Sequence, residues 1–488
     1  MTDIRVISAG VELRHAQRIL GRSLGILALF GVFRAETIEG FLSYLLISSA
    51  AVLPAALWLR ARAPGIPILP AVAAFHFLYF AVPILRQDPA QPVYTPWEVL
   101  HAAFTVALFL GTATLAWAFI VGRYLRRSRN IAADLPARVA SRPLIFGGLA
   151  VGLLFQLAAM SGWLIGLGSF FGVIRAIALT MASISCYLLG NSRARHWLHG
   201  QLWGVALAGL VLNVVLSWSS LLLVGGMQFV LAAVLGYLLA AKRIPWMALM
   251  PFFGVLFVLH AGKGEMRERY WSEGYSQGVA VSQVPNMMGE WLVEGIAATA
   301  TGETRQDIID RASLLYMLLR VQQATPEYIP YLGGETYALL PTYLVPRFID
   351  PDKRFSQAGL ALLNTRYGVQ TQEGVRTTTI GWGIIAEAFA NFGMVGVLGA
   401  GLLFGMLSAA FTRWSTGAAP LSLPMLLSIA AMVTLINLEA DFGYLINNLW
   451  QALAATLIFV LPFKYLSADS GKRAIASVPF LSEKAHRG

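Results

Sequence analysis

Cationic side chains recur in residues 263–379, a polar stretch between two apolar blocks, with eleven Lys and Arg against thirteen Asp and Glu. Arginine offers a planar fork of donors that holds phosphate or diphosphate by two-point contact, and it stays charged at every accessible pH. The pattern predicts anion binding. For any single arginine, pairing with an acid on a solvated helix face is the alternative. The cations are Lys263, Arg267, Arg269, Arg305, Arg311, Arg320, Arg347, Lys353, Arg354, Arg366 and Arg376.

Three groups of these cations occupy distinctive settings. Lys263 and Arg267 are four residues apart at the end of an apolar segment, so they share one helix face at the membrane surface. Snorkelling toward the lipid headgroups is the alternative for Lys263. Arg347 belongs to a proline-punctuated turn, and Arg376 precedes the returning apolar segment, where helix N-terminal amides favour anions. These groups bracket the mouth of a membrane bundle.

Polar residues inside apolar segments are a second signal, because each is costly in lipid. Glu387 and Asn391 lie four apart in the returning segment and therefore share a face. Glu387 is the best candidate for a general base, and a buried carboxylate paired with an arginine is the competing interpretation. Glu439 and Asp441 crowd the last outer turn, where the sequence favours a structural role.

The composition assigns these residues to a membrane protein. Apolar residues make up 57% of the 488 residues, only 12% are charged, and mean hydropathy is +0.65, whereas soluble domains are roughly 25% charged. Continuous runs of about 20 apolar residues predict an all-α polytopic helix bundle rather than a strand barrel. The runs are 40–59, 65–85, 97–122, 143–166, 169–189, 197–218, 221–241, 245–262, 382–411, 421–438 and 444–462. A shorter run at 23–33 makes the prediction eleven or twelve spans.

Lys and Arg in the short loops set the orientation. They collect on one side, which is predicted to be cytoplasmic, and residues 263–379 then lie on the opposite, outer side. Positive-inside bias should deplete cations there, which is why their number needs a reason. The predicted organisation is an N-terminal membrane bundle (1–262), an outer loop (263–379), a C-terminal bundle of three spans (380–465) and a cytoplasmic tail (466–488). Amphipathic helices at 283–298 and 306–322 are predicted to cover the bundle mouth from the membrane surface. Thr325-Pro326 is predicted to end the second of these helices, and Gly333-Gly334 to form a turn after it.

Two classes of function are disfavoured by the sequence. The basic residues outside the loop are spread over membrane-adjacent segments, so nucleic acid is not the implied partner. Cys186 is the only cysteine, and the seven histidines show no HExxH or HxxxH pairing, so no metal site of the Cys or Cys/His type is expected. No cofactor is predicted.

Four elements carry a resemblance to a known family. These are LHAGKGEMRERYW, RASLLYMLL with Thr325-Pro326, LGGETYALLPTYLVPRFIDPDKR, and VRTTTIGWGIIAEAFANFG with the apolar run after it. They contain K-x-x-x-R-x-x-x-W, ending at Trp271, then Pro-Arg-(x)5-Lys and Glu-(x)3-Asn-Phe-Gly. In this order and spacing they resemble the bacterial O-antigen and exopolysaccharide repeat-unit polymerases over roughly the C-terminal half.

The resemblance implies a metal-independent glycosyltransferase of the bacterial inner membrane with a large periplasmic loop. Its substrate would be a glycan on undecaprenyl diphosphate, and a chain-length regulator and a flippase of the same pathway are possible partners. Position in the motifs implies Lys263, Arg267, Arg347 and Arg376 as diphosphate or glycan ligands. Arg311, Lys353, Asn391 and Trp271 are further ligand candidates, and Glu387 would be a base or would orient an arginine.

Two other functions stay open at this point. A glycan-lipid flippase or exporter would explain polar residues in spans, and an O-antigen ligase would keep the chemistry but change the acceptor. The sequence also departs from the family, since many relatives carry an arginine soon after a Ser in a middle span. Here the comparable stretch, 219–228, has no cation.

Overall fold

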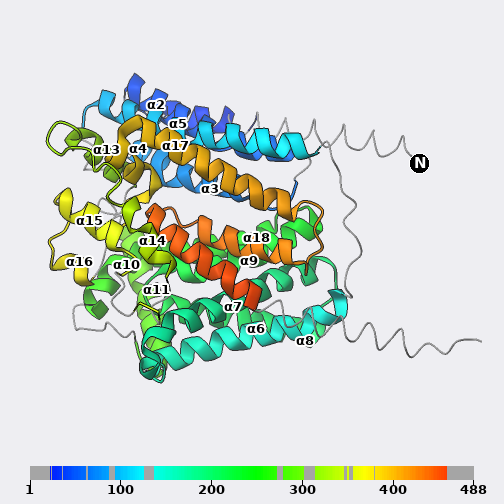
Figure 1. Cartoon of the computed structure of the whole chain (residues 1–488). Helices are drawn as coiled ribbons and strands as arrows, with labels where there is room; N and C mark the ends of the chain where they lie inside the picture. The colour runs from blue at the N-terminus through cyan, green and yellow to red at the C-terminus, as the bar shows by residue number, and fades with distance from the viewer. Residues whose placement is uncertain are drawn as a thin grey trace, which may run out of the picture.

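A computed structural model describes most of the chain and shows helices arranged largely side by side (Figure 1). It describes residues 22, 25–33, 35, 37–61, 64–86, 94–125, 137–271, 279–301, 314–345, 349–350, 355–377 and 380–458. Within these ranges there is no β-strand. The all-α prediction is therefore confirmed for the described residues, as lipid requires when a backbone must satisfy its own hydrogen bonds.

Nine helices in the described part of the chain are long and apolar enough to cross a membrane, so the protein is a multi-pass membrane protein. Eight precede the loop. The second is one continuous span made of α3, a π-helical turn η1 and α4. The elements are α2 (Ile38–Arg60), α3 (Ile68–His76), η1 (Phe77–Ala81), α4 (Val82–Arg86), α5 (Pro96–Leu125), α6 (Ala137–Met160), α7 (Phe171–Ala194), α8 (Gly200–Trp218), α9 (Leu223–Ala241), α10 (Trp246–Trp271) and α17 (Gly383–Ser415).

Three further predicted spans do not reach that length in the described residues. Helix α18 (Leu423–Leu435) has 13 residues, and helical residues 442–458 follow it. Residues 25–33 are helical. At 1.5 Å per residue, α18 rises only about 20 Å, less than the roughly 30 Å hydrocarbon core. The count of eleven or twelve spans therefore stays a prediction, with nine shown.

Small residues allow the spans to approach closely, as expected where lipid tails supply no hydrophobic drive between helices. Gly401 and Gly405 of α17 form a G-x-x-x-G pair facing α5. A Cβ on Gly405 would lie 2.2 Å from the Ala113 carbonyl oxygen. Helices α7 and α9 meet in the same way, because a Cβ on Gly236 would lie 2.0 Å from the Tyr187 carbonyl oxygen. Backbone-to-backbone contact thus fixes these helix pairs.

The loop between α10 and α17 is mostly helical where it is described. Its helices are α11 (Val284–Thr301), α13 (Leu314–Ala324), α14 (Leu340–Leu344), α15 (Ala358–Arg366) and α16 (Gly374–Thr377), with the 3₁₀ turn η5 (Tyr337–Leu339) before α14. Helices α13, α15 and α16 lie toward the end of the bundle where α17 begins (Figure 1). The predicted break at Thr325-Pro326 is confirmed, because α13 ends at Ala324. The expected boundary at 262/263 falls inside α10.

Long-range hydrogen bonds tie two loop helices to the spans. Trp291 of α11 donates from Nε1 to the Leu259 carbonyl of α10 at 2.6 Å. Gln322 of α13 donates from Nε2 to Thr105 Oγ1 of α5 at 2.7 Å. These two hydrogen bonds anchor the loop helices α11 and α13 to the membrane bundle. A cover over the bundle mouth would require such contacts.

Candidate functional site

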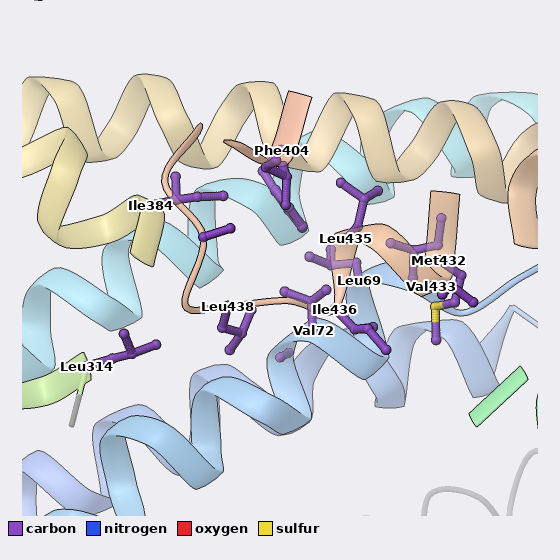
Figure 2. Close-up of a cluster of buried hydrophobic side chains, with 14 of the residues drawn as sticks. Leu69, Val72, Leu314, Ile384, Phe404, Met432, Val433, Leu435, Ile436 and Leu438 are labelled. Carbon is purple, nitrogen blue, oxygen red and sulfur yellow. The ribbon is translucent and has the colours of Figure 1, made fainter. Parts of the chain in front are cut away.

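The site is organised by the turn between α18 and helix 442–458. Because α18 is short, this turn is buried within the protein. Ile436, Ala440 and Asp441 are only 4%, 2% and 1% exposed. Figure 2 shows Leu435, Ile436 and Leu438 near Leu69 and Val72 of α3. Non-helical backbone at membrane depth is tolerated where protein surrounds it, and it is typical of functional sites in membrane proteins.

Lys263 and Arg267 approach one side of this turn. Both lie on α10 and are partly buried, in agreement with the shared helix face that their spacing predicts. Their two charges repel each other, and both are attracted by the Glu439 carboxylate of the turn. Arg267 Nη2 also donates to the Leu221 carbonyl at 3.2 Å. One carboxylate thus faces two cations.

Two more segments complete the cation cluster. Tyr79, in the π-helical turn η1, donates from its hydroxyl to Glu439 Oε1 at 3.1 Å. Leu221 adopts a left-handed φ of 58° between α8 and α9, a conformation that is strained for a branched side chain. Its carbonyl is the one that accepts from Arg267. The cluster of Lys263, Arg267, Glu439 and Tyr79, hereafter the cation cluster, therefore joins three parts of the bundle.

Asp441 of the turn and Glu387 of α17 both bind the start of the helix that follows the turn. Glu387 Oε2 accepts from the Phe442 amide at 2.6 Å, and Asp441 Oδ1 accepts from the Tyr444 amide at 2.7 Å. Both amides belong to the first turn of helix 442–458, where N–H groups lack intrahelical partners and the helix dipole favours negative charge. Asp441 is thus the N-cap of this helix, and Glu387 is a second cap supplied by α17.

The other oxygen of each carboxyl group has no acceptable hydrogen bond within the described residues. These atoms are Glu387 Oε1 and Asp441 Oδ2. The Thr336 hydroxyl interacts with the Glu387 carboxyl, and the Leu360 backbone with the Asp441 carboxyl. Neither contact gives Glu387 Oε1 or Asp441 Oδ2 a hydrogen bond of good geometry. The Glu387 and Asp441 side chains are 0% and 1% exposed. Burial raises the pKa of Asp441, because removal from water penalises its charged form. It also raises the pKa of Tyr337, with smaller contributions from the charges of Glu387 and Asp441.

A break in α17 explains the Asn391-Phe392-Gly393 motif. Phe392 and Gly393 leave helical geometry, with Gly393 at φ 61° and ψ −146°. The break frees two carbonyls: Ala390 accepts from the Leu332 amide at 3.0 Å, and Asn391 accepts from the Gly333 amide at 3.2 Å. The loop segment 331–336 thus docks into α17.

The Asn391 side chain extends this docking. Its Nδ2 donates to Thr336 Oγ1 and to the Glu387 carbonyl, both at 2.9 Å, and its Oδ1 accepts from the Gly334 amide at 3.0 Å. The predicted shared face of Glu387 and Asn391 is confirmed. The role is structural, because all these contacts hold the loop segment against the start of α17.

The structure brings only some predicted site residues together. Lys263 and Arg267 belong to the cation cluster, whereas Glu387 and Asn391, joined by a hydrogen bond within α17, bind the segments around Phe442 and Thr336. The Glu387 carboxyl bonds to a backbone amide rather than to an arginine of the described residues. Arg311, Arg347 and Lys353 lie outside the described residues. Arg376 lies within α16, and Trp271 is the last residue of α10. The structure does not describe the side chain of either residue.

The sequence favoured a structural role over a catalytic one for Glu439 and Asp441. In the structure the Glu439 carboxylate attracts both Lys263 and Arg267, and Asp441 is close enough to Glu387 for their charges to interact. Their spacing, two apart in a short polar turn between apolar runs, was the available signal. What the spacing could not give is which distant helix would face each carboxylate.

Chemically, the cation cluster can hold an anionic oxygen, and the buried carboxyl pair can accept or hold a proton. In the described residues, no three His, Cys, Asp or Glu side chains are grouped as metal ligands. No family model matches the chain, and no curated protein or solved structure matches it significantly.

Proposed function

We propose that the protein polymerises lipid-diphosphate-linked oligosaccharide repeat units at the outer face of the bacterial inner membrane. The observation that carries this proposal is the cation cluster, in which Lys263 and Arg267 meet at the bundle end where the loop leaves the membrane. Two half-buried cations facing a single carboxylate leave net positive charge in a partly dehydrated place. There, charge acts on a departing diphosphate more strongly than it would in water.

The proposed reaction transfers the growing glycan from its lipid carrier to an incoming unit. A hydroxyl oxygen of the incoming sugar attacks the anomeric carbon of the donor, and the bond from that carbon to the diphosphate oxygen breaks. The bonding pair leaves with the lipid diphosphate, whose added charge Lys263 and Arg267 would stabilise, together with Arg347 and Arg376 as the resemblance implies. The hydroxyl proton passes to a base, for which Glu387 is the candidate.

The buried carboxyl pair fits the base role for a physical reason. Two neighbouring buried carboxylates resist a shared double charge, so such a pair takes up a proton readily. The helix N-terminus beneath them supplies the amides that keep one charge tolerable. The base would thus lie at the Asp441 end of the 439–441 turn, with the cations at the Glu439 end.

The cation cluster also bears on the departure from the family. Arg267 reaches the Leu221 carbonyl, in the stretch 219–228 where many relatives carry an arginine. Arg267 therefore brings a guanidinium to that stretch from a different helix. This supports the proposed function by supplying the missing cation from α10.

A glycan-lipid flippase or exporter is a second candidate, favoured by the break in α17. Discontinuous helices beside buried ionisable residues are typical of transporters, and Gly393 lies six residues beyond the buried Glu387. In that case Glu387 and Asp441 would carry protons during transport rather than catalyse transfer. The polymerase remains the preferred function, because breaking the bond to the diphosphate requires cations that stabilise the departing charge, and the cation cluster supplies them.

Deletion of the gene and gel analysis of the surface glycan separates the candidates. A polymerase mutant should retain single-repeat product, and wild-type chain lengths should return on complementation. Accumulation of lipid-linked units with no surface sugar would refute the polymerase and support the flippase. Full-length polymer that stays on its lipid carrier would instead identify a ligase.

A further inference from the structure

A polar cavity lies at the opposite end of the bundle from the cation cluster. It has a volume of about 620 Å³, within the range of small-molecule sites. Helices α2, α7, α9 and α17 all end at it, through Arg60, Arg195, Lys242 and Ser415. Ser415 and Glu387 stand at the two ends of α17, roughly 40 Å apart at 1.5 Å per residue. The cavity is therefore separate from the site described above.

The cavity wall carries positive charge that no carboxylate of the described residues offsets. Arg60, Arg195 and Lys242 line it, and its described lining contains neither Asp nor Glu. Arg195 and Lys242 are close enough to repel each other. Together with partial burial, which is the larger effect, this lowers the pKa of Lys242. The guanidinium of Arg195 is held over the Trp197 ring at 5.1 Å, which restricts its position.

Two buried polar side chains belong to the cavity lining. Tyr187 and Asn191 are 1% and 2% exposed. The Asn191 Oδ1 atom is itself closed off from solvent, so a molecule in the cavity does not reach it. Recognition of a ligand therefore rests on the three cations.

General causes account for one cation here but not for the arrangement. Basic residues complement the C-terminal carbonyls of helices, and they collect on the cytoplasmic side of membranes. Neither cause requires three of them to border one cavity with no carboxylate in its described lining. All three side chains are exposed to solvent, so a ligand entering the cavity can reach them.

We propose that this cavity binds a phosphate ester. Arg60, Arg195 and Lys242 would hold the phosphate through charge-assisted hydrogen bonds. The same chemistry is offered by a soluble polyol phosphate and by the headgroup of an anionic glycerophospholipid. By the positive-inside pattern, this end of the bundle is the cytoplasmic one. The site does not depend on the glycan polymerase proposal.

The test uses the full chain purified in detergent and two probes. sn-Glycerol 3-phosphate is titrated calorimetrically, and retention of phosphatidylglycerol against phosphatidylcholine is measured by native mass spectrometry. Arg195→Gln and Lys242→Gln should each weaken binding about tenfold, the loss of one charge-assisted contact. Binding should be lost in the double variant. Arg195→Lys should keep part of the affinity that Arg195→Gln loses. Arg243→Gln, next to Lys242 but outside the cavity lining, is the matched control.

The outcomes separate the two sources and can overturn the site. Saturable binding of glycerol phosphate that the Gln variants lose supports a free phosphate ester as the ligand. Selective retention of phosphatidylglycerol alone, lost in the same variants, supports a lipid headgroup. The proposal is overturned if neither probe distinguishes the wild type from the double variant, or if Arg243→Gln weakens binding equally.

Discussion

The break in α17 gives the sharpest prediction, because replacing Gly393 by alanine disturbs both a backbone angle and a contact. Gly393 has φ 61° and ψ −146°, a region that is nearly confined to glycine and costs other residues about 1–3 kcal/mol. A Cβ there would lie 2.8 Å from Tyr331 Oη, closer than real contacts allow. The Tyr331 ring would have to shift, and Tyr331 is the first residue of the segment 331–336 that docks into the break.

The magnitude follows from what that movement removes. The amides of Leu332 and Gly333 bond to carbonyls freed by the break, and each bond contributes about 1 kcal/mol net. Adding these two bonds to the backbone strain gives a total of about 3–5 kcal/mol. Gly399→Ala is the matched control, since Gly399 lies in the same helix with open space around its Cβ position. That change should be neutral or slightly stabilising, by up to about 1 kcal/mol.

Thermal unfolding in detergent, followed by tryptophan fluorescence at one scan rate, measures the difference. The Gly393→Ala midpoint should fall clearly below wild type while the Gly399→Ala midpoint does not. Amide hydrogen exchange should also speed up in residues 331–336 of the Gly393 variant, because their anchoring carbonyls move. Equal midpoints for the two variants, together with unchanged exchange in this segment, would refute the docking account of the Asn391-Phe392-Gly393 motif.

Three further predictions concern charge and topology. Arg267→Ala should abolish polymer formation while the protein still inserts into the membrane. Arg269 is exposed and pairs with two glutamates of α11, so Arg269→Ala should keep the wild-type glycan chain length on gels. Equal loss of polymer in both variants would remove Arg267 from the site. Burial raises the pKa of Asp441, so the folded state holds its proton above the ordinary pKa of about 4 while the unfolded state loses it. Stability should therefore fall as pH rises through that window, and Asp441→Asn should flatten the profile of unfolding midpoint against pH; an unchanged slope would contradict this. Cys186 is buried and is the only cysteine, so a cysteine introduced at the surface can be labelled selectively. Tyr328→Cys, at a side chain that is 75% exposed, should react with an impermeant maleimide in intact spheroplasts, whereas Arg243→Cys should react only after lysis. The reverse labelling would invert the predicted orientation.

Much of the fold followed from the sequence, because lipid imposes local rules. A span needs about 20 apolar residues in a row, and such runs predicted the nine helices long enough to cross. Local turn chemistry also held: α13 ends just before Thr325-Pro326, and Gly333 and Gly334 take the positive φ values that a turn requires. The sequence did not predict that α18 ends as early as Leu435, because the apolar run continues into the turn at 436–438.

The candidate site was only half predictable. Spacing placed Lys263 with Arg267, and Glu387 with Asn391, since residues four apart share a helix face. Their partners come from far along the chain: Glu439 for the cations, and the Phe442 amide for Glu387. No periodicity records which helix packs against which, because that choice depends on close backbone approaches such as Gly405 on α5.

The sequence alone determined that this chain crosses the membrane many times and carries an unusual set of cations in the loop between its two apolar blocks. Tertiary structure alone decided that the short turn 439–441 brings Glu439 to Lys263 and Arg267, and Asp441 to Glu387. It also decided that Arg60, Arg195 and Lys242 border one cavity. The physical reason is that spans are selected residue by residue against lipid. Convergence of side chains instead depends on how whole helices pack, which no single segment encodes.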